Sequence, residues 1–471
     1  MKNYKIYCGG EFVTTRLEHT VTNKYSNKVF AKTFLADSKL LDKAIIAAQE
    51  AKALCRDLSS QEKFTALKFI SESLEKNKQQ LATVLCIESG KPFVYALGEI
   101  ERAAQTFLIA AEESKRLPGE YMSLDWTANG KNKAGIINYF PIGIVAGISP
   151  FNFPMNLAVH KIAPAIAAGC PIILKPASTT PLSTLELAKI IDQTALPKGM
   201  ISILPMDRPT GNLLVTDERI SLLSFTGSPA IGWELKKQSG KKKVVLELGG
   251  NAGVIVSNIN NVKEIIARCM AGAFSYSGQI CIHAQRFFVH TDIFDSFLKL
   301  MKTEAKKMAQ GDPVKKETKL SSMIDEHNAR RVEEWVSEAL DQGAELVCGG
   351  KRKGSFYEAT ILTNTNARMK VSAEEVFGPV ICIEKYNGTI EDAVQKINDT
   401  KFGLQCGVFT DSVRELDYCF KHLDVGGVIH NDAPTLRFDQ MPYGGIKESG
   451  LGREGVKYAI QDMMEARILV K

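Results

Sequence analysis

The sequence lacks the features that would set it apart from ordinary folded proteins. It contains no internal repeat and no low-complexity tract, and none of its ten cysteines forms a CxxC pair. Cysteines scattered in this way are typical of reduced, mostly buried thiols, and they argue against a disulfide framework or a zinc knuckle. The sequence therefore predicts no metal site.

Long apolar runs are missing as well. No stretch reaches the roughly 18 apolar residues that a membrane-spanning helix needs, and residues 1–5 lead into no hydrophobic signal core. We therefore expect no secretory signal, no contact with a membrane and a reducing, cytoplasmic location.

Neither charge sign is strongly in excess. Lys and Arg number 59 against 53 Asp and Glu, which leaves a net charge of +6 over 471 residues. The basic run Lys241–Lys243 stands directly before a hydrophobic strand and indicates a solvated strand entrance. Because there is neither a basic domain nor a nucleic-acid motif, nucleic acid is not an expected partner.

What is present is an alternation of helical and β-rich segments. At about 150 residues per domain, the length predicts two to four domains. Apolar residues at helical spacing predict helices over 40–55, 62–88, 94–116, 157–168, 182–194 and 262–274. Short β-rich runs predict strands over 136–140, 143–148, 172–174, 201–204, 244–248, 253–256, 286–289, 380–384 and 427–430. This pattern favours an α/β fold whose parallel sheets are covered on both faces, with a boundary near Gly249 and Gly250.

Cys281 stands apart from the other cysteines. It follows the small, flexible segment Ser277-Gly278-Gln279, between the predicted helix over 262–274 and the predicted strand over 286–289. A thiol in a loop at the head of a sheet can be exposed and reactive. The alternative is that Cys281 is a structural thiol.

Glu247 places an acid in an otherwise apolar strand, directly before Leu248, Gly249 and Gly250. Burying a polar group without a partner costs about 2–7 kcal/mol, and more if the group is ionised. Either Glu247 pairs with a nearby lysine at the rim of the strand, or its pKa is raised and it acts as a general base.

Two turns follow predicted strands. The turn Pro150–Pro154 leaves the amide of Asn152 at the carboxyl end of a strand, where open α/β sheets bind ligands. That amide either caps the next helix or donates to an oxyanion. The segment 224–232 runs from a strand through Gly227-Ser228 into a helix, whose first amides suit a pyrophosphate, although the pattern departs from GxGxxG.

Together, these four elements resemble the aldehyde dehydrogenase superfamily, and the resemblance covers essentially the whole chain. Further matches occur in the family's order and at similar spacings, namely Leu174-Lys175-Pro176, Glu374–Pro379, Phe402-Gly403-Leu404 and Pro442–Gly450. Segments 426–432 and 450–458 look most like the lactaldehyde and non-phosphorylating glyceraldehyde-3-phosphate dehydrogenase branch.

The resemblance implies NAD(P)-dependent oxidation of an aldehyde to a carboxylic acid through a cysteine thioester. Cys281 would be the nucleophile, and the Asn152 amide with the Cys281 backbone N–H would hold the oxyanion. Glu247 would activate the water that hydrolyses the thioester. Sulfur suits this chemistry, because a thiolate attacks readily and its thioester is labile.

The implied cofactor is NAD or NADP. Lys175 matches the family's lysine on the adenosine ribose, Ser228 its pyrophosphate contact, and Glu375 its carboxylate on the nicotinamide ribose. Ser178 stands where many NAD-preferring members carry a glutamate, so a 2′-phosphate would meet no repulsion and NADP should be accepted. The expected cofactor residues are Ile148, Ser149, Pro150, Phe151, Lys175, Ser178, Gly227, Ser228, Gly232, Leu248, Glu375 and Phe377.

The implied fold has three parts. Residues 1–122 and 142–246 would form a Rossmann-like cofactor domain, and 247–440 an α/β catalytic domain. Residues 123–141 and 459–471 would form a β oligomerisation arm. Because such arms extend a neighbour's sheet, a homodimer or homotetramer is expected.

A small polar or anionic aldehyde, such as lactaldehyde, is the expected substrate. Arg102 belongs to a helix that borders the substrate tunnel in the family, and Arg437 to a loop over its mouth. His160 lies about two helical turns beyond the Asn152 turn. Each has a structural alternative: His160 is a satisfied interface histidine, Arg102 pairs with Glu99, and Arg437 pairs with Asp439.

Three other functions stay open. CoA-acylating dehydrogenases commonly lack the glutamate base that Glu247 would supply. Enzymes for phospho-, phosphono- or sulfo-aldehydes form a second class, although the phosphate-specific ones often carry an arginine where Ile280 stands. A non-catalytic protein on the same scaffold would tend to lose Cys281 or Glu247.

Overall fold

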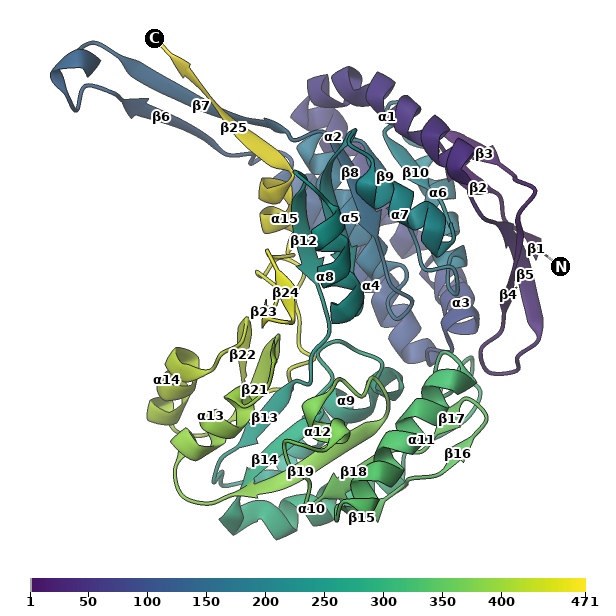
Figure 1. Ribbon diagram of the computed structural model, residues 1–471, viewed down its shortest axis with the longest axis vertical. Coiled ribbons are helices and arrows are strands. Elements are labelled where there is room, and N and C mark those ends of the chain that lie inside the picture. The colour runs from purple at the N-terminus through teal and green to yellow at the C-terminus, as the bar shows by residue number, and fades with distance from the viewer. Residues whose placement is uncertain (1) are drawn as a thin grey trace.

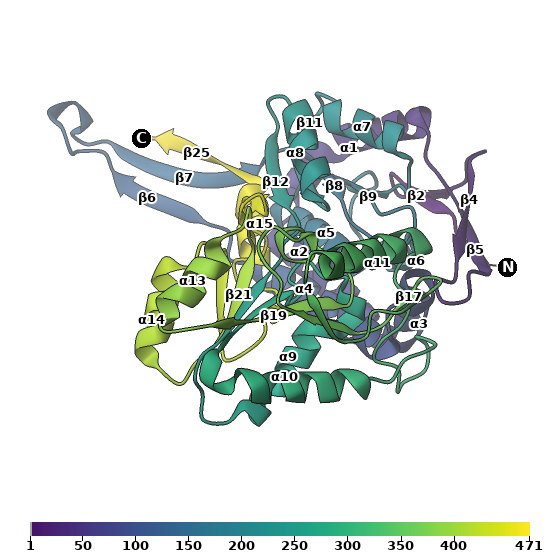
Figure 2. The same ribbon diagram turned by 60° about the horizontal axis from the view of Figure 1, so that its bottom comes forward.

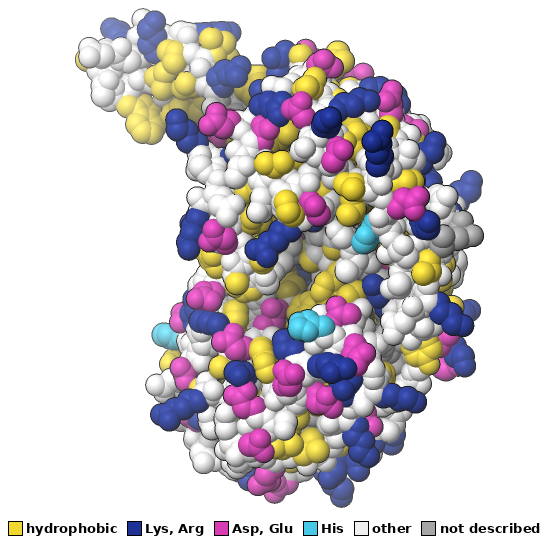
Figure 3. Space-filling view, turned by 45° about the vertical axis from the view of Figure 1, so that its right-hand side comes forward, with side chains coloured by type: hydrophobic (Ala, Val, Ile, Leu, Met, Phe, Trp, Pro, Cys, Tyr) yellow, Lys and Arg dark blue, Asp and Glu magenta, His cyan; other side chains and the backbone are white. Residues whose placement is uncertain are grey.

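Two β-sheets organise the chain. The computed structural model describes residues 2–471 and contains one sheet of eight strands and another of seven. Figure 1 shows the two sheets in separate lobes, with a hairpin and the C-terminal strand projecting as an arm. Figure 3 shows that one face of the molecule is hollowed between the lobes and that apolar side chains lie in the hollow. The α/β class predicted from the sequence is confirmed.

The first sheet is parallel at its centre and antiparallel at its edges. Its strand order is β24-β12-β11-β8-β9-β10-β2-β3. The strands are β2 (Ile6–Cys8), β3 (Glu11–Val13), β8 (Ile144–Ile148), β9 (Ile172–Lys175), β10 (Ile201–Ile203), β11 (Ile220–Thr226), β12 (Lys243–Glu247) and β24 (Gly450–Leu451). The second half of the chain therefore returns one short strand to the first sheet.

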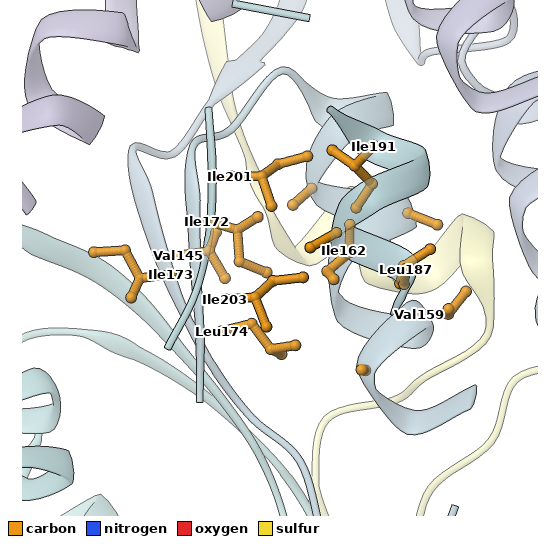
Figure 4. Packing of buried hydrophobic residues seen from close by; sticks show 14 of the residues in the cluster. Val145, Val159, Ile162, Ile172, Ile173, Leu174, Leu187, Ile191, Ile201 and Ile203 are labelled. Carbon is orange, nitrogen blue, oxygen red and sulfur yellow. The ribbon is translucent and has the colours of Figure 1, made fainter. Parts of the chain in front are cut away.

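The central strands are apolar on both faces because helices cover both faces. In the parallel strands β8, β9 and β10 the residues are almost all buried, and every residue of helix α5 (Asn156–Ala168) is buried as well. Figure 4 shows side chains of these strands, such as Val145, Ile172 and Ile203, packed against Ile162 and Leu187. Continuous apolar runs are typical of parallel strands that are buried on both sides.

The parallel strands of the first sheet end together. Their register pairs Ile148 with both Lys175 and Phe225, and it pairs Thr226 with Glu247. Strands β9 and β10 lie on one side of β8, and β11 and β12 lie on the other, so the winding reverses between β8 and β11. Open α/β sheets bind ligands beyond the carboxyl ends of the strands at such a reversal. The turns after β8, β9 and β11 all lie at this edge.

The second sheet has the order β15-β18-β19-β14-β13-β21-β22, and only β15 is antiparallel to its neighbour. Its strands are β13 (Gly253–Val256), β14 (Arg286–His290), β15 (Glu345–Cys348), β18 (Thr360–Thr363), β19 (Val380–Tyr386), β21 (Gln405–Phe409) and β22 (Gly427–His430). Figure 2 shows helices α9 and α10 against this sheet.

All six predicted helical segments are helical, with one difference, and the structure adds α7 and α10 to α15, which were not predicted. The segment predicted as one helix over 62–88 is two helices separated at Asn77, which ends the first one. The helices are α1 (Ser38–Asp57), α2 (Ser60–Lys76), α3 (Lys78–Ser89), α4 (Phe93–Glu113), α5, α6 (Leu182–Ile191), α7 (Arg208–Thr216), α8 (Pro229–Gln238), α9 (Val262–Phe274), α10 (Thr291–Lys306), α11 (Glu326–Asp341), α12 (Lys370–Ala373), α13 (Ile390–Asn398), α14 (Val413–His422) and α15 (Val456–Asp462). Among the described residues, no helix has the length and apolar run that crossing a membrane requires.

The arm is a three-stranded sheet in the order β25-β7-β6. Its strands are β6 (Gly119–Ser123), β7 (Ala134–Pro141) and β25 (Met464–Val470). The hairpin therefore begins at Gly119 rather than at the predicted residue 123. Residues 459–462, predicted to belong to the arm, end helix α15, which packs on α4 and α5 of the first lobe.

A buried ion pair joins α4 to the turn that follows β8. Lys91 and Glu99 are both fully buried and form this pair. The second carboxylate oxygen of Glu99 accepts hydrogen bonds from the backbone N–H groups of Met155 (3.0 Å) and Asn156 (3.1 Å), where α5 begins. The Lys91 ammonium also lies 3.6 Å from the centroid of the Phe153 ring. Glu99 therefore caps α5 and holds the preceding turn in place.

Replacing Glu99 by glutamine should lower the free energy of unfolding by about 3–5 kcal/mol, because Lys91 would stay buried without its counter-charge. Urea titration of the parent and the variant measures this loss. Glu72→Gln is a matched control, since it removes a carboxylate from an exposed pair with Lys68 and should cost less than about 1 kcal/mol. Equally small losses in both variants would contradict a structural role for the buried pair.

Candidate active site

Cys281 is the only one of the ten cysteines that is not fully buried. It lies in the loop between α9 and β14, after a short turn in which Tyr276 and Ser277 adopt φ values of 49° and 53°. Gly278 also has a positive φ of 69°, and a Cβ atom there would lie 2.1 Å from the carbonyl oxygen of Gly378. The loop is therefore strained and closely packed, a condition that persists only where the surrounding structure enforces it.

The sulfur of Cys281 lies 3.0 Å from the hydroxyl oxygen of Tyr443. Burial raises the pKa of the Cys281 thiol to about 11, whereas the hydrogen bond with Tyr443 and the charge of Arg437 act to lower it. Tyr443 belongs to the segment Pro442–Gly450 that matches the family, but the resemblance implied no role for it.

Asn152 links the turn after β8 to the loop that carries Cys281. Its side-chain N–H donates to the backbone carbonyl of Gln279 at 2.9 Å. Its carbonyl oxygen is buried without a hydrogen-bond partner among the described residues. Because Glu99 caps α5, the alternative in which Asn152 caps that helix is wrong. An amide nitrogen carries two hydrogens, so the bond to Gln279 leaves one of them available to a ligand.

Glu247 ends strand β12 and is 3% exposed. Neither of its carboxylate oxygens has a hydrogen-bond partner among the described residues, so the predicted alternative of a pair with a lysine is wrong. A Cβ atom at Gly444 would lie 2.7 Å from Oε1, which shows how closely the backbone approaches. Burial and the nearby charge of Glu454 raise the pKa of Glu247 well above its usual range.

A chain of buried charges lies behind these groups. The Glu454 carboxylate is 3.0 Å from Nη2 of Arg437 and 3.3 Å from Nζ of Lys161. Lys161 also donates to the hydroxyl groups of Ser224 (3.1 Å) and Thr226 (2.8 Å) on β11. Arg437 thus pairs with Glu454 and not with Asp439, the partner that the sequence suggested. The Lys161 and Arg437 charges hold the pKa of Glu454 below its usual value even though burial acts to raise it.

Asp439 joins the other two predicted substrate residues. Arg102 donates to both of its carboxylate oxygens, at 2.6 and 3.4 Å, and so does not pair with Glu99. His160 Nε2 lies 2.9 Å from Asp439 and 3.3 Å from Arg437. The side chain of His160 is completely buried behind these residues. His160 does not line the cavity that Arg102 and Arg437 line, and the alternative of a satisfied histidine holds only for Nε2, because Nδ1 has no hydrogen-bond partner among the described residues.

A cavity of about 910 Å³ opens between α4 and loop residues 435–440, which follow β22. Arg102 and Arg437 line it, as does Ile280, the neighbour of Cys281. The guanidinium of Arg437 is almost fully buried, and its Nε has no acceptor among the described residues. Buried polar groups are normally paired, so an unpaired N–H beside a cavity indicates a position for a ligand oxygen.

A second cavity, of about 300 Å³, lies beyond the carboxyl ends of β8 and β9. Ile148, Lys175 and Ser178 of the expected cofactor set line it. Arg208, the first residue of α7, also lines it and was not foreseen from the sequence. The Ser178 hydroxyl donates to the carbonyl oxygen of Met206 at 3.1 Å.

The other expected cofactor residues continue from this cavity toward Cys281. The Ser149 backbone N–H donates to the carbonyl of Lys175 (3.1 Å), while its hydroxyl is buried without a partner among the described residues; Pro150 follows in the same turn. Ser228 precedes helix α8 without capping it. The hydroxyl groups of Ser149 and Ser228 are thus left available to a phosphate or a sugar.

At the carboxyl edge of the first sheet, two glycines allow close contacts between neighbouring segments. The Gly227 N–H donates to the carbonyl of Glu247 at 3.0 Å. A Cβ atom at Gly232 would lie 2.3 Å from the side chain of Leu248, so α8 packs tightly on the strand. A larger residue at position 232 would require the Leu248 side chain to move.

Glu375 and Phe377 lie on the side of the second lobe. The carboxylate of Glu375 accepts from the Gly250 N–H at 3.2 Å, and burial raises its pKa to about 7. The Phe377 ring meets that of Phe151 edge to face, with centroids 5.8 Å apart. The first lobe, through Phe151, and the second lobe, through Phe377, therefore meet among the expected cofactor residues.

The residues that sequence reasoning missed had weak signals. Lys161 is a single charge in the apolar helix α5, and Glu454 follows a glycine-rich segment. Both become meaningful only when the fold brings them together. Arg208 follows a strand by only a few residues, and its position at the carboxyl edge depends on the strand order.

The fold and this arrangement of thiol, amide and carboxylate beside two cavities define the class of protein. The model of the aldehyde dehydrogenase family matches residues 12–469, and the chain belongs to that family. It is an aldehyde dehydrogenase that uses NAD or NADP.

Relatives cover the whole chain. The 3-sulfolactaldehyde dehydrogenase of Priestia aryabhattai is 40% identical over 471 residues, 100% of this chain and 98% of the relative. The crystal structure of aldehyde dehydrogenase 21 from Physcomitrella patens, in complex with its reaction product succinate, has a TM-score of 0.98 and 44% identity over 100% of this chain and 98% of that one. The glyceraldehyde-3-phosphate dehydrogenase of Methanocaldococcus jannaschii, complexed with NADP, has a TM-score of 0.93 and 34% identity over 97% of this chain and 99% of that one.

Proposed function

We propose that this enzyme oxidises a short aldehyde that carries an anionic group, and that Cys281, Asn152 and Glu247 perform the reaction. The observation that carries the proposal is the cavity whose wall includes both Ile280, the residue before Cys281, and Arg437. A molecule that reached both would have a carbonyl at one end and an oxyanion at the other.

In the first half-reaction, the sulfur of Cys281 attacks the aldehyde carbon and a thiohemiacetal forms. The second amide hydrogen of Asn152 and the Cys281 backbone N–H would stabilise the oxyanion, and one such donor is typically worth about 2.7–4 kcal/mol. NAD(P) supplies the hydride acceptor, and Lys175, Ser228 and Glu375 would hold it. Collapse of the oxyanion leaves a thioester on Cys281.

In the second half-reaction, Glu247 would take a proton from water, and the resulting hydroxide attacks the thioester carbonyl. Acid is released and the thiol is restored. The raised pKa of Glu247 suits a general base, because a carboxylate with an ordinary pKa binds a proton too weakly to remove one from water.

Arg437 and Arg102 would select the substrate. Arginine binds carboxylate and sulfonate groups through paired N–H donors. The relatives are consistent with this selection, since one is named for a sulfonated aldehyde and another holds succinate, a dicarboxylate. An uncharged hydroxy-aldehyde such as lactaldehyde is the second candidate, which the basic residues favour less.

NADP is the proposed preferred cofactor. The cavity that would receive the adenosine ribose has two basic residues in its wall, Lys175 and Arg208, and Ser178 in place of a carboxylate. Glu234 also lines this cavity, so the two cations leave a net positive charge there, which favours the doubly charged 2′-phosphate.

The arm would join copies of this chain. Its outer strands, β6 and β25, are sheet edges, and they expose large apolar side chains. These are Tyr121, Ile468, Leu469 and Val470, with Trp126 at the tip of the hairpin. An exposed apolar edge strand is a template for pairing with another chain, which supports a homodimer or homotetramer.

Glu247→Gln should stop the cycle at the thioester. Rapid mixing should show a burst of reduced cofactor close to one per active site, followed by slow turnover, whereas Cys281→Ala should give no burst. In the parent, turnover should rise with pH through the raised pKa of Glu247, since only the ionised carboxylate accepts a proton. The glutamine variant should lack that rise.

If the glutamine variant turned over like the parent, Glu247 would not be the base. Parent turnover that required CoA would favour the CoA-acylating alternative instead. The absence of any reduced cofactor with all aldehydes would favour a non-catalytic protein.

Arg102→Leu should lower kcat/KM for sulfolactaldehyde and succinate semialdehyde by about one to two decades, because a charged hydrogen-bond donor is lost. The same substitution should change kcat/KM for propanal by less than about threefold, because propanal carries no charge. Arg116→Leu is the matched control, since Arg116 is exposed and pairs only with Glu113. Equal losses for charged and uncharged aldehydes would contradict the basic-pocket proposal.

Arg208→Ala should lower kcat/KM for NADP by about one to two decades and leave the value for NAD nearly unchanged. The reason is that the Arg208 guanidinium would contact only the 2′-phosphate, which NAD lacks. NAD kinetics serve as the internal control for folding and catalysis. Similar changes for both cofactors would show that Arg208 does not contact the 2′-phosphate.

A further inference from the structure

The Tyr443 hydroxyl and the Cys281 sulfur are each other's only hydrogen-bonding side-chain partners among the described residues. Tyr443 is 2% exposed, so its hydroxyl has little access to water. A buried hydroxyl without a partner is unfavourable, and the 3.0 Å contact with sulfur satisfies it. The contact lies at the atom that would attack the substrate.

Three contacts hold Tyr443 in position. Its backbone N–H donates to the carbonyl of Glu454 at 3.0 Å, and the Glu454 N–H donates back to the carbonyl of Tyr443 at 2.6 Å. The guanidinium of Arg437 lies 3.7 Å from the centroid of the Tyr443 ring. Because Arg437 also pairs with Glu454, the ring cannot move without breaking buried contacts. The hydroxyl is therefore presented to the sulfur by a fixed frame.

Either atom could donate in this hydrogen bond, but once Cys281 is ionised the Tyr443 hydroxyl must be the donor, because a thiolate has no hydrogen to give. Burial raises the pKa of Tyr443 well above its usual value, so its hydroxyl stays protonated and can donate. Burial also raises the pKa of the Cys281 thiol, and the charges of Glu375 and Glu247 act in the same direction. Only the Tyr443 hydrogen bond and the Arg437 charge oppose them. The thiolate is the nucleophilic form, and it needs a donor in this setting.

We propose that the Tyr443 hydroxyl donates a hydrogen bond to the Cys281 thiolate and is a catalytic residue, which stabilises the thiolate relative to the thiol and holds the sulfur in position. The inference rests on the proposed role of Cys281 as nucleophile. When the sulfur lone pair forms the bond to the carbonyl carbon, the carbonyl π electrons move to oxygen and the phenol keeps its proton. The hydrogen bond weakens as the negative charge leaves sulfur.

The test is alkylation of Cys281 by iodoacetamide in the holoenzyme, followed by mass spectrometry of the labelled peptide. This readout does not depend on turnover. Tyr443→Phe keeps the ring beneath Arg437 and removes only the hydroxyl. Losing a hydrogen bond to a charged acceptor should raise the pH midpoint of alkylation by about one to two units.

In Tyr443→Phe, the rate of alkylation at neutral pH should fall by a smaller factor than the fraction of Cys281 that is ionised. Nucleophilicity rises as the thiol becomes more basic, with a Brønsted slope of about 0.4–0.5, so the expected decrease is about three- to tenfold. Tyr95→Phe is the matched control, because Tyr95 packs in the same apolar cluster and forms no hydrogen bond with Sγ. Its midpoint should equal that of the parent.

An unchanged midpoint and rate in Tyr443→Phe would overturn the inference. Faster alkylation would also overturn it, because that result means that the thiol donates to the hydroxyl. Failure of the proposed function is distinguishable from either outcome, since the parent would then give no burst of reduced cofactor although Cys281 is still alkylated.

Discussion

The buried carboxylate of Glu454 is the constraint on which the site depends. It pairs with Lys161 on α5 and with Arg437 in the preceding loop, and its backbone pairs with Tyr443. Removing one member of a buried ion pair typically costs 3–5 kcal/mol, because the other charge stays out of water. A helix, a loop and a strand-like segment must therefore keep their relative positions, and with them the hydroxyl that meets the sulfur of Cys281.

Against this paired background, a few groups remain unpaired. Both carboxylate oxygens of Glu247, the carbonyl oxygen of Asn152 and Nε of Arg437 are buried without hydrogen-bond partners among the described residues. Each would cost stability in an ordinary core. Arg437 lines the larger cavity, and its Nε–H would donate to an anionic oxygen of a ligand. The oxygens of Glu247 and Asn152 are acceptors, so water or another hydrogen-bond donor would complete them. Preorganised groups of this kind need no rearrangement when charge develops during the reaction, and that is the physical basis of the proposed mechanism.

Local patterns were sufficient to predict the α/β class, nine of the strands and the turns that carry Asn152 and Ser228, because apolar periodicity and turn residues act over short distances. The resemblance then selected Cys281 and Glu247. The partners of the arginines were not predictable, since Arg102 and Asp439 are 337 residues apart in the chain. Spacing suggested Glu99 for Arg102, yet Glu99 pairs with Lys91 and caps α5. Tyr443 gained meaning only from its distance to sulfur.

The central claim is that the substrate becomes covalently attached to Cys281 and to no other cysteine. Acid quenching of the parent enzyme during turnover with NADP and an anionic aldehyde, followed by peptide mass spectrometry, tests it directly. The account predicts that the peptide containing Cys281 gains the mass of the acyl group and that the nine buried cysteines stay unmodified. A turning-over enzyme without this adduct, or with the adduct on another residue, would contradict the account.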